Sequence, residues 1–400
     1  MGIKIEGGLA FVMSTPKLVF LTRNYPPTIC GIGDHTYHLA QEMSRRGVEV
    51  YVICSADQGA GKLDNIRVYP VVKKWDKGGM DCIFRLVAEI DPDWVVVQYV
   101  PHMYHPKGLP LALLSLYQSL SRSDFRVMTI FHEVKIRPER NPKKMTMSFL
   151  QGQIAYGLSR KSSKIVTSID FYAHNLRRLG NRKTVIPIGS NILPIPVSEE
   201  SLKKLRDRYG IAEGAKVVCT FGNRDIRPYL PTFDKLSAEY PKMVWLLCGK
   251  NTTPHHVFAS RPYIRYLGEM KSEEIYRHLS LGEVFFMPDF VTEKGEGGTC
   301  SKSGSLACAF SLGIPIIGTK GDMNNMLLVD GKNLLLTDTK DPESLYRAFI
   351  SCFDSEKLCS VLGKNALELY KSTLSWDVLA TKLMKMMDIV NNIHEIYTNG

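Results

Sequence analysis

Short apolar runs alternate with amphipathic stretches along most of the chain. In the first part, runs typical of buried strands lie at 18–21, 48–53, 94–97, 127–131, 164–167 and 184–187. Most are separated by stretches in which apolar residues recur with the 3.6-residue period of a helix. Strands that alternate with helices in this way predict a parallel sheet with helices on both of its faces.

The pattern restarts after a polar, proline-containing segment at 191–196, which we interpret as a hinge. A charged helix is expected at 199–209, followed by strands at 217–222, 244–249, 263–268, 283–288, 314–318 and 333–336. The last stretch, 376–397, predicts a single amphipathic helix. We therefore expect two α/β domains in tandem, each binding ligands at the carboxyl ends of its strands and together enclosing a cleft.

Composition and charge narrow the possible partners. The chain has 400 residues and a formal net charge of +11, and residues 1–190 hold all of this excess. Such one-sided charge predicts an anionic partner for the first half, with a merely solvated surface as the alternative. The nine cysteines are scattered without metal-ligand spacing, which favours free thiols in a reducing compartment. No apolar run approaches the roughly 20 residues that span a bilayer, and the first residues do not resemble a signal peptide.

A Gly/Ser turn precedes a short helical stretch near the end of the second half. Ser303, Gly304 and Ser305 open this stretch, which ends at Gly313. Backbone N–H groups at a helix N-terminus bind anions, most often phosphate. The alternative interpretation is an ordinary helix cap.

Two glycines follow the first predicted strand. Gly31 and Gly33 permit a close approach of the backbone to a ligand. They form only a weak dinucleotide fingerprint, because the third glycine and the acidic residue after the second strand are missing. This departure counts against a dehydrogenase.

The order of these motifs resembles the retaining glycosyltransferases of family four, which have the GT-B fold. The similarity extends over nearly the whole chain and rests on segments 26–40, 46–50, 131–133, 185–189, 221–224, 266–268, 303–315, 330–334 and 374–376. The resemblance implies two Rossmann-like domains facing across a cleft. Residues 1–190 would form the acceptor domain, completed by a crossing helix at 376–400, and residues 191–375 the nucleotide-sugar domain.

The resemblance also implies roles for particular residues. His132 would contact the transferred sugar near the reacting carbon, although a lone histidine after a strand is often structural. A departing diphosphate needs positive charge and oriented N–H groups. The candidates for donor binding are Gly31, Gly33, Arg224, Arg227, Leu267, Gly268, Lys302, Ser303, Gly304 and Ser305.

The chain departs from the family at its acidic motif. Many members carry two glutamates spaced eight residues apart, and the matching positions here are Cys300 and Cys308. Glu293 and Glu296 lie upstream, and we favour Glu296 as the catalytic-site acid because two glycines follow it. No metal site is expected, so basic groups would do the work that a divalent cation does elsewhere. No cofactor is implied beyond the nucleotide-diphosphate sugar used as donor.

A cationic segment follows His132 and is followed by apolar residues at 145–150. Its members are Lys135, Arg137, Arg140, Lys143 and Lys144, and His102 is a further candidate at the cleft. Such a segment suits an anionic membrane surface or a phosphate-bearing acceptor, with a flexible solvated loop as the alternative. Nucleic acid is not expected, because no reading motif accompanies the charge. We expect a cytoplasmic protein, in peripheral contact with the inner face of the membrane.

These observations support one leading hypothesis and leave others open. The leading hypothesis is transfer of a sugar from a nucleotide-diphosphate donor to a glycan, a lipid-linked or a small acceptor, with retention of configuration. An epimerase or a phosphorylase of the same fold is an alternative enzyme. The non-enzymatic alternative is a degenerate transferase that only binds a nucleotide or a partner, and the missing second glutamate motivates it.

Overall fold

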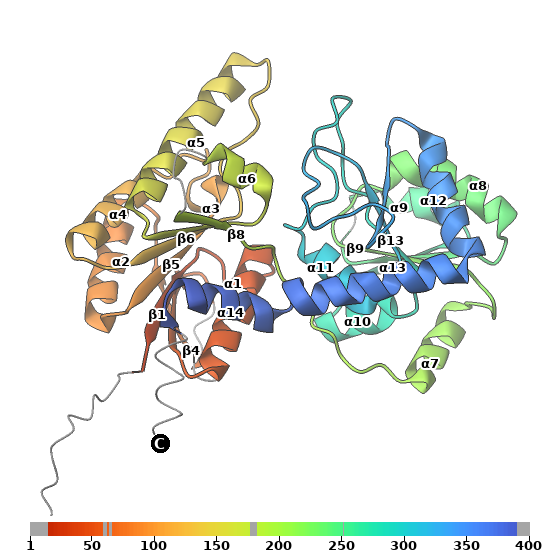
Figure 1. The fold of residues 1–400 in the computed structure, drawn as a ribbon, viewed down its shortest axis with the longest axis horizontal. Coiled ribbons are helices and arrows are strands. Elements are labelled where there is room, and N and C mark those ends of the chain that lie inside the picture. Colours follow the sequence, from red (N-terminus) through yellow and green to blue (C-terminus); the bar gives the residue numbers. More distant parts are fainter. Residues whose placement is uncertain (1–14, 59–61, 64–65, 177–181, 251, 390–400) are drawn as a thin grey trace, which may run out of the picture. The chain divides into compact units, whose positions relative to one another are not determined.

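A computed structural model of the chain describes residues 15–58, 62–63, 66–176, 182–250 and 252–389 (Figure 1). These residues form two compact units. The first contains the chain up to Ile130, Val134–Ile165 and the segment from Ala380 onward, and the second contains Phe131–Glu133 and Val166–Leu379. His132 therefore belongs to the second unit. The predicted domain bounds, with a boundary after residue 190, stay a prediction.

The first sheet has eight strands in the order β3-β4-β2-β1-β5-β6-β7-β8. The strands are β1 Lys17–Leu21, β2 Glu49–Ser55, β3 Lys62–Leu63, β4 Ile66–Val72, β5 Trp94–Tyr99, β6 Val127–Phe131, β7 Lys164–Thr167 and β8 Lys183–Val185. β1 pairs in parallel with β2 and β5. β3 and β4 were not predicted from the sequence, because β3 has only two residues and β4 buries fully only its two ends.

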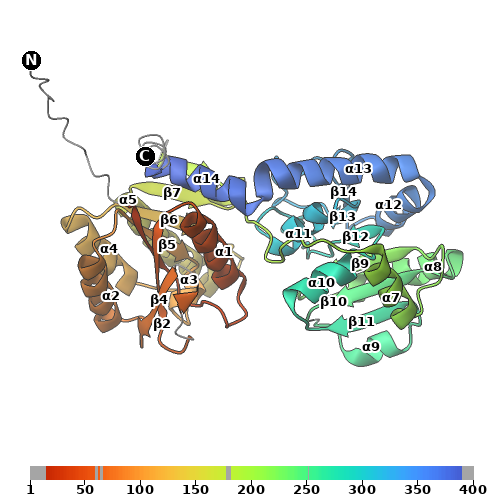
Figure 2. The same cartoon turned by 90° about the horizontal axis from the view of Figure 1, so that it is seen from below.

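Helices cover both faces of this sheet. They are α1 Gly31–Arg45, α2 Lys77–Ile90, α3 Pro101–Tyr104, α4 Ala112–Arg122, α5 Pro142–Lys161 and α6 Asp170–Asn175. α2 and α4 lie side by side on one face and α1 lies on the other (Figure 2). This arrangement explains why β1, β5 and β6 are almost wholly buried and appear as continuous apolar runs.

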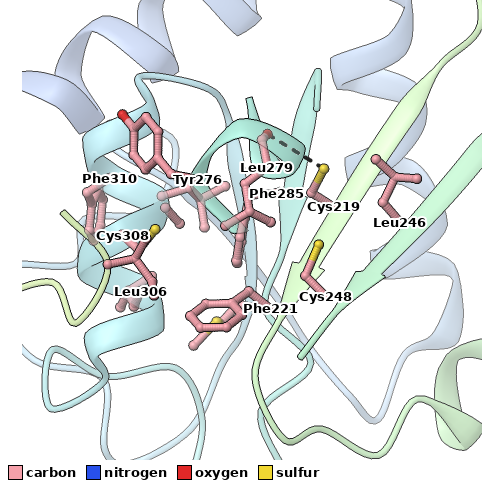
Figure 3. Close-up of a cluster of buried hydrophobic side chains, with 14 of the residues drawn as sticks. Cys219, Phe221, Leu246, Cys248, Tyr276, Leu279, Phe285, Leu306, Cys308 and Phe310 are labelled. Atoms are coloured by element: carbon pink, nitrogen blue, oxygen red, sulfur yellow. Dashed lines mark hydrogen bonds between the residues drawn. The ribbon is translucent and has the colours of Figure 1, made fainter. Parts of the chain in front are cut away.

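The second sheet has six strands in the order β11-β10-β9-β12-β13-β14, all paired in parallel. Its elements are α7 Glu199–Tyr209, β9 Val217–Phe221, η2 Arg227–Tyr229, α8 Leu230–Glu239, β10 Val244–Cys248, α9 His255–Ala259, β11 Ile264–Gly268, α10 Ser272–Leu279, β12 Val284–Phe286, α11 Gly304–Leu312, β13 Ile316–Thr319, β14 Leu335–Thr337, α12 Pro342–Asp354, α13 Glu356–Leu369 and η3 Tyr370–Leu374. Successive residues of β9 enter different hydrophobic clusters: Val217 and Cys219 join one, and Val218 joins the other. Both faces of this sheet are therefore covered, as the sequence predicts. Figure 3 shows the first of these clusters.

The last helix begins where it is expected but ends earlier. α14 spans Trp376–Met386, and Asp388 has a positive φ of 58° that turns the chain. The predicted continuation to residue 397 lies beyond Ile389, outside the described residues. The end of this segment belongs to the first unit, where Trp94 Nε1 donates a hydrogen bond of 3.0 Å to the Met387 carbonyl. Within the described part of the chain, none of the helices has the length and apolar character required to cross a bilayer.

Candidate functional site

The N-terminus of α11 forms the centre of the candidate site. Ser303 caps the helix, and its Oγ accepts a hydrogen bond of 3.3 Å from the Leu306 N–H. The N–H groups of Gly304 and Ser305 lie in the first turn, where no partner exists within a helix. The predicted turn is therefore the start of a helix, and its binding of an anion stays a prediction.

A glycine at the end of β9 lets α11 come close to the sheet. Gly222 has a φ of 101°, and a Cβ added there would lie 3.1 Å from Ser305 Oγ. Its N–H bonds to the Cys248 carbonyl at 3.1 Å, and Gly249 bonds in turn to the Gly268 carbonyl at 2.8 Å. The carboxyl ends of β9, β10 and β11 thus form one row, and Gly268 and its neighbour Leu267 lie at the β11 end of it.

Arg224 connects this edge to α11. Its Nη2 lies 3.4 Å from Ser303 Oγ and 3.4 Å from Asp289 Oδ1, and both charged side chains are largely buried. Burial raises the pKa of Asp289, and nearby Arg224 opposes that rise. Arg224 Nε and Asp289 Oδ2 are buried without a hydrogen-bond partner. Such unsatisfied atoms beside a helix N-terminus indicate a place for a polar ligand.

Lys302 precedes the helix cap and forms a second cationic group. Its Nζ donates a hydrogen bond of 3.1 Å to Tyr172 Oη and lies 3.6 Å from Glu133 Oε1. Burial alone would lower the pKa of Lys302, but Tyr172 and Glu133 outweigh it and raise the pKa above its usual value. The ammonium group therefore stays charged throughout the neutral range.

His132 lies beside Lys302. The imidazole is only 8% exposed. Burial, and then the charge of Lys302, lower its pKa to about 4. The ring is therefore neutral at pH 7.

Further polar atoms are buried around the same turn. Asn191 Oδ1 has no hydrogen-bond partner, and a Cβ added at Gly304 would lie 3.0 Å from it. Ser301 Oγ accepts a hydrogen bond of 2.7 Å from Asn325 Nδ2, while Asn325 Oδ1 is unpartnered. These atoms extend the polar surroundings of Lys302 and Ser303.

The two cysteines at the family's acidic positions do not carry the charge of an acid. Cys308 is fully buried and points into the hydrophobic cluster (Figure 3). Burial raises the pKa of this thiol to about 12 and that of Cys300 to about 11. Both thiols are therefore neutral, and Cys308 faces the core.

Glu296 and Glu293 lie on a loop that closes on itself through the pairing of Val291 with Gly297. A Cβ added at Gly298, where φ is 90°, would lie 2.7 Å from the Gly321 nitrogen, so this loop tolerates only glycine there. Glu293 lines a cavity of 440 Å³ with Tyr229 and Phe290. The choice of Glu296 as the acid that contacts the sugar stays a prediction.

The structure distinguishes the two arginines that the sequence treats together. Arg227 forms two hydrogen bonds with Asp225, of 2.9 and 2.7 Å, and its side chain is 58% exposed. Arg224 instead contacts the α11 N-terminus. Its role in donor binding has geometric support that Arg227 lacks.

The remaining candidates lie in the first unit. Gly31 and Gly33 open α1, and a Cβ added at Gly33 would lie 3.1 Å from the Asn24 carbonyl oxygen. His102 lies in α3, with its Nε2 3.3 Å from Gln151 Nε2.

The cationic segment leads into α5. Asn141 caps this helix by accepting hydrogen bonds from the N–H groups of Lys143 and Lys144. Lys144 Nζ pairs with Glu139 at 2.7 Å. Lys135 and Arg137 are partly buried, whereas Lys143 is exposed, as are Met145, Phe149 and Leu150. The segment is therefore a surface with charged and apolar side chains together.

Sequence reasoning missed several residues of the site. Asp289 directly follows a predicted strand, so its position at the edge of the sheet was a usable signal. Tyr172 and Asn191 come close to residues 302–304 only through the fold, and nothing in their sequence surroundings indicates it. Among the described residues, no cluster of three or more histidine, cysteine or acidic side chains is arranged to hold a metal ion.

Comparison with known proteins agrees with this architecture. The sequence model of Glycosyltransferase Family 4 matches residues 29–192. No curated protein sequence matches the chain. The structure of HepE from Anabaena in complex with UDP-glucose is 14% identical, with a TM-score of 0.66 over 93% of this chain and 99% of HepE.

Two further structures illustrate how widely this fold is used. Sucrose-phosphate synthase from Thermosynechococcus elongatus is 13% identical, with a TM-score of 0.67 over 96% of this chain and 100% of that one. A glycosyltransferase from Rickettsia africae is 14% identical, with a TM-score of 0.66 over 94% and 99%. The chain therefore has the GT-B fold, and its residues 29–192 are similar to the family 4 glycosyltransferases. Both the predicted fold and the predicted resemblance are confirmed.

Proposed function

We propose that the chain is a glycosyltransferase that moves a sugar from a nucleotide-diphosphate donor to an acceptor. The observation that carries this proposal is the start of α11. There the free N–H groups of Gly304 and Ser305 lie beside the buried guanidinium of Arg224. A diphosphate placed here would meet donors and positive charge already in position, which is the arrangement that stabilises a leaving group.

The comparisons support a nucleotide-sugar donor. HepE, which shares the fold, was crystallised with UDP-glucose. In the present chain the row of strand ends from Gly222 to Gly268 would hold the nucleoside, Arg224 and α11 the diphosphate, and Lys302 and His132 the sugar. Glu296 would accept hydrogen bonds from sugar hydroxyls.

We further propose that transfer retains the anomeric configuration and needs no metal ion. As the bond between sugar and phosphate breaks, negative charge develops on the leaving oxygen, and Arg224 and the α11 N–H groups would stabilise it. The leaving phosphate would accept the proton of the acceptor hydroxyl on the same face of the sugar. His132, neutral at pH 7, would orient the sugar without taking this proton.

The acceptor is proposed to be a glycan, a lipid-linked or a phosphate-bearing molecule. The cationic segment with exposed Met145 and Phe149 supports contact with an anionic membrane, because charge and apolar area both favour binding there. The nine free cysteines support a cytoplasmic location. The first unit, with Gly31, Gly33 and His102, would bind the acceptor.

A second candidate function is binding without catalysis. It is favoured by Cys300 and Cys308, which are neutral where the family carries acids. Under this alternative the site would hold a nucleotide or a nucleotide sugar but would not transfer or hydrolyse it.

The test combines binding with turnover. Isothermal titration with UDP, GDP and ADP identifies the nucleoside, and assays of the corresponding nucleotide sugars measure hydrolysis and transfer to lipid-linked and soluble acceptors. Nucleotide binding that is lost in Arg224→Ala, together with product whose anomeric configuration matches the donor, is the expected result. Binding without turnover over this acceptor set would favour the second candidate, and the absence of any nucleotide binding would overturn both.

A further inference from the structure

The two cationic side chains of the site, Arg224 and Lys302, contact different residues. Arg224 Nη2 lies 3.4 Å from Ser303 Oγ at the α11 N-terminus and 3.4 Å from Asp289. Lys302 is adjacent to the same serine in sequence, but its Nζ lies against Tyr172 Oη and Glu133 instead. The guanidinium is therefore placed for a diphosphate, whereas the ammonium lies on the side of His132.

The ammonium of Lys302 retains hydrogen-bonding capacity. An ammonium has three N–H donors. Here one donates to Tyr172 at 3.1 Å, and Glu133 lies at the longer distance of 3.6 Å. The side chain of Lys302 is 32% exposed and that of Glu133 is 45% exposed, so an anion can reach the ammonium and displace the looser partner at small cost.

Besides the carboxylates of Glu133 and Asp289, the groups around Lys302 are neutral. His132 is buried beside it and neutral, and Cys300 is a buried neutral thiol. Protein carboxylates are the usual partners for neutral sugar hydroxyls. A partly buried ammonium binds a ligand carboxylate more strongly than it binds a neutral hydroxyl, because the hydrogen bond is charge-assisted.

We propose that the donor sugar carries a carboxylate, as in a nucleotide-linked uronic acid, and that Lys302 binds it. This inference rests on the proposed function, because it requires the sugar of the donor to lie near His132. Lys302 is then the specificity-determining residue. Tyr172 is a positioning residue, whose hydroxyl holds the ammonium in place.

Matched donors test this inference directly. UDP-glucose and UDP-glucuronic acid differ only at C6, as do GDP-mannose and GDP-mannuronic acid. Titration of the full chain with each pair, and with UDP and GDP alone, separates recognition of the carboxylate from recognition of the nucleotide. We expect the uronate to bind about 100-fold more tightly than its neutral partner.

Variants locate the effect. Lys302→Met should remove the preference for the uronate while changing the affinity for the bare nucleotide by less than about threefold. Tyr172→Phe should reduce the preference by about tenfold, and it should do so through KM rather than kcat. Lys364→Met removes an exposed lysine of α13 and serves as the matched control, with no expected change.

The outcomes separate this inference from the proposed function. Suppose that a nucleotide binds, and that the neutral donor of that pair binds as tightly as the uronate. The inference is then overturned and the proposed function stands. An equal loss of bare nucleotide and of both donors in Lys302→Met also overturns it, because the ammonium would then hold the diphosphate. If neither these donors nor UDP, GDP or ADP binds, both fail.

Discussion

The cationic segment of the first unit and the cation pair of the second unit are built in opposite ways. The segment from Lys135 to Lys144 concentrates more positive charge along the sequence, yet much of it faces solvent beside exposed apolar side chains. Arg224 and Lys302 are 78 residues apart in sequence, and both are largely buried among named partners.

The difference teaches which charges can recognise a particular ligand. Exposed charges are screened by water and salt, so they attract any anionic surface with about 1 kcal/mol per residue. A buried cation keeps its strength but needs fixed partners, as Asp289 and Tyr172 provide. The density of charge along the sequence is therefore a poor guide to specific binding.

The largest effect is expected from breaking the buried pair. Arg224→Ala should weaken binding of the nucleoside diphosphate by about 100-fold and lower the free energy of unfolding by about 2 kcal/mol, because Asp289 is left buried without its partner. Calorimetric titration and urea unfolding measure the two effects. Arg277→Ala, which breaks an exposed pair with Glu273 on α10, is the control; a similar loss in both variants would contradict the comparison.

Burial of His132 predicts a dependence of stability on pH. Its pKa is about 4 in the folded chain, below the ordinary 6.5, so the unfolded chain takes up a proton first as the pH falls. This group should therefore lower the free energy of unfolding by about 2 kcal/mol between pH 7 and pH 5.

Urea unfolding of the native chain and of His132→Asn at the two pH values measures this contribution. The variant should lose less stability on acidification than the native chain. His256→Asn changes an exposed histidine of α9 and should leave the pH dependence unaltered. Identical pH dependence in all three proteins would show that His132 is not buried in its neutral form.

The rigidity of the second unit's site is tested at two glycines. Gly298→Ala should lower the free energy of unfolding by about 3 kcal/mol, because φ is positive and the new Cβ would collide with Gly321. Gly331→Ala has a similar φ of 70° but open space, and it should cost only about 1 kcal/mol. Thermal unfolding of both variants provides the measurement, and equal costs would show that the loop adapts.

The smallest effect per residue is expected in the cationic segment. Lys143→Glu combined with Arg140→Glu should weaken sedimentation with phosphatidylglycerol vesicles by about 1 kcal/mol for each charge, and more salt should weaken it further. Turnover with a soluble acceptor should remain unchanged. Vesicle binding that is unaffected by the reversal would leave the segment as a solvated surface.

The sequence predicted the fold closely where burial is two-sided. β6 and β7 have the predicted bounds, because all but one of their residues are buried. β4 was missed because only its two end residues are fully buried. The periodicity of apolar residues along the sequence reflects burial, so a partly exposed helix or strand has only a weak pattern.

The candidate site was predictable only in part. The turn at Ser303 and the cation at Arg224 follow strands or open a helix, so local patterns located them. Asp289 directly follows a predicted strand and could have been found in the same way, whereas Tyr172 reaches Lys302 only through tertiary packing. The direction of Cys308, toward the core, depends on which face of α11 packs against the sheet.

The hydrogen bond from Trp94 to the Met387 carbonyl has a consequence for synthesis on the ribosome. The partner of this indole is translated after the 214 residues of Val166–Leu379 have been added. At the usual elongation rates of about 5–20 residues per second, this takes roughly 10–40 s. During that time the nascent first unit lacks its final segment, so the Trp94 indole cannot yet form this hydrogen bond.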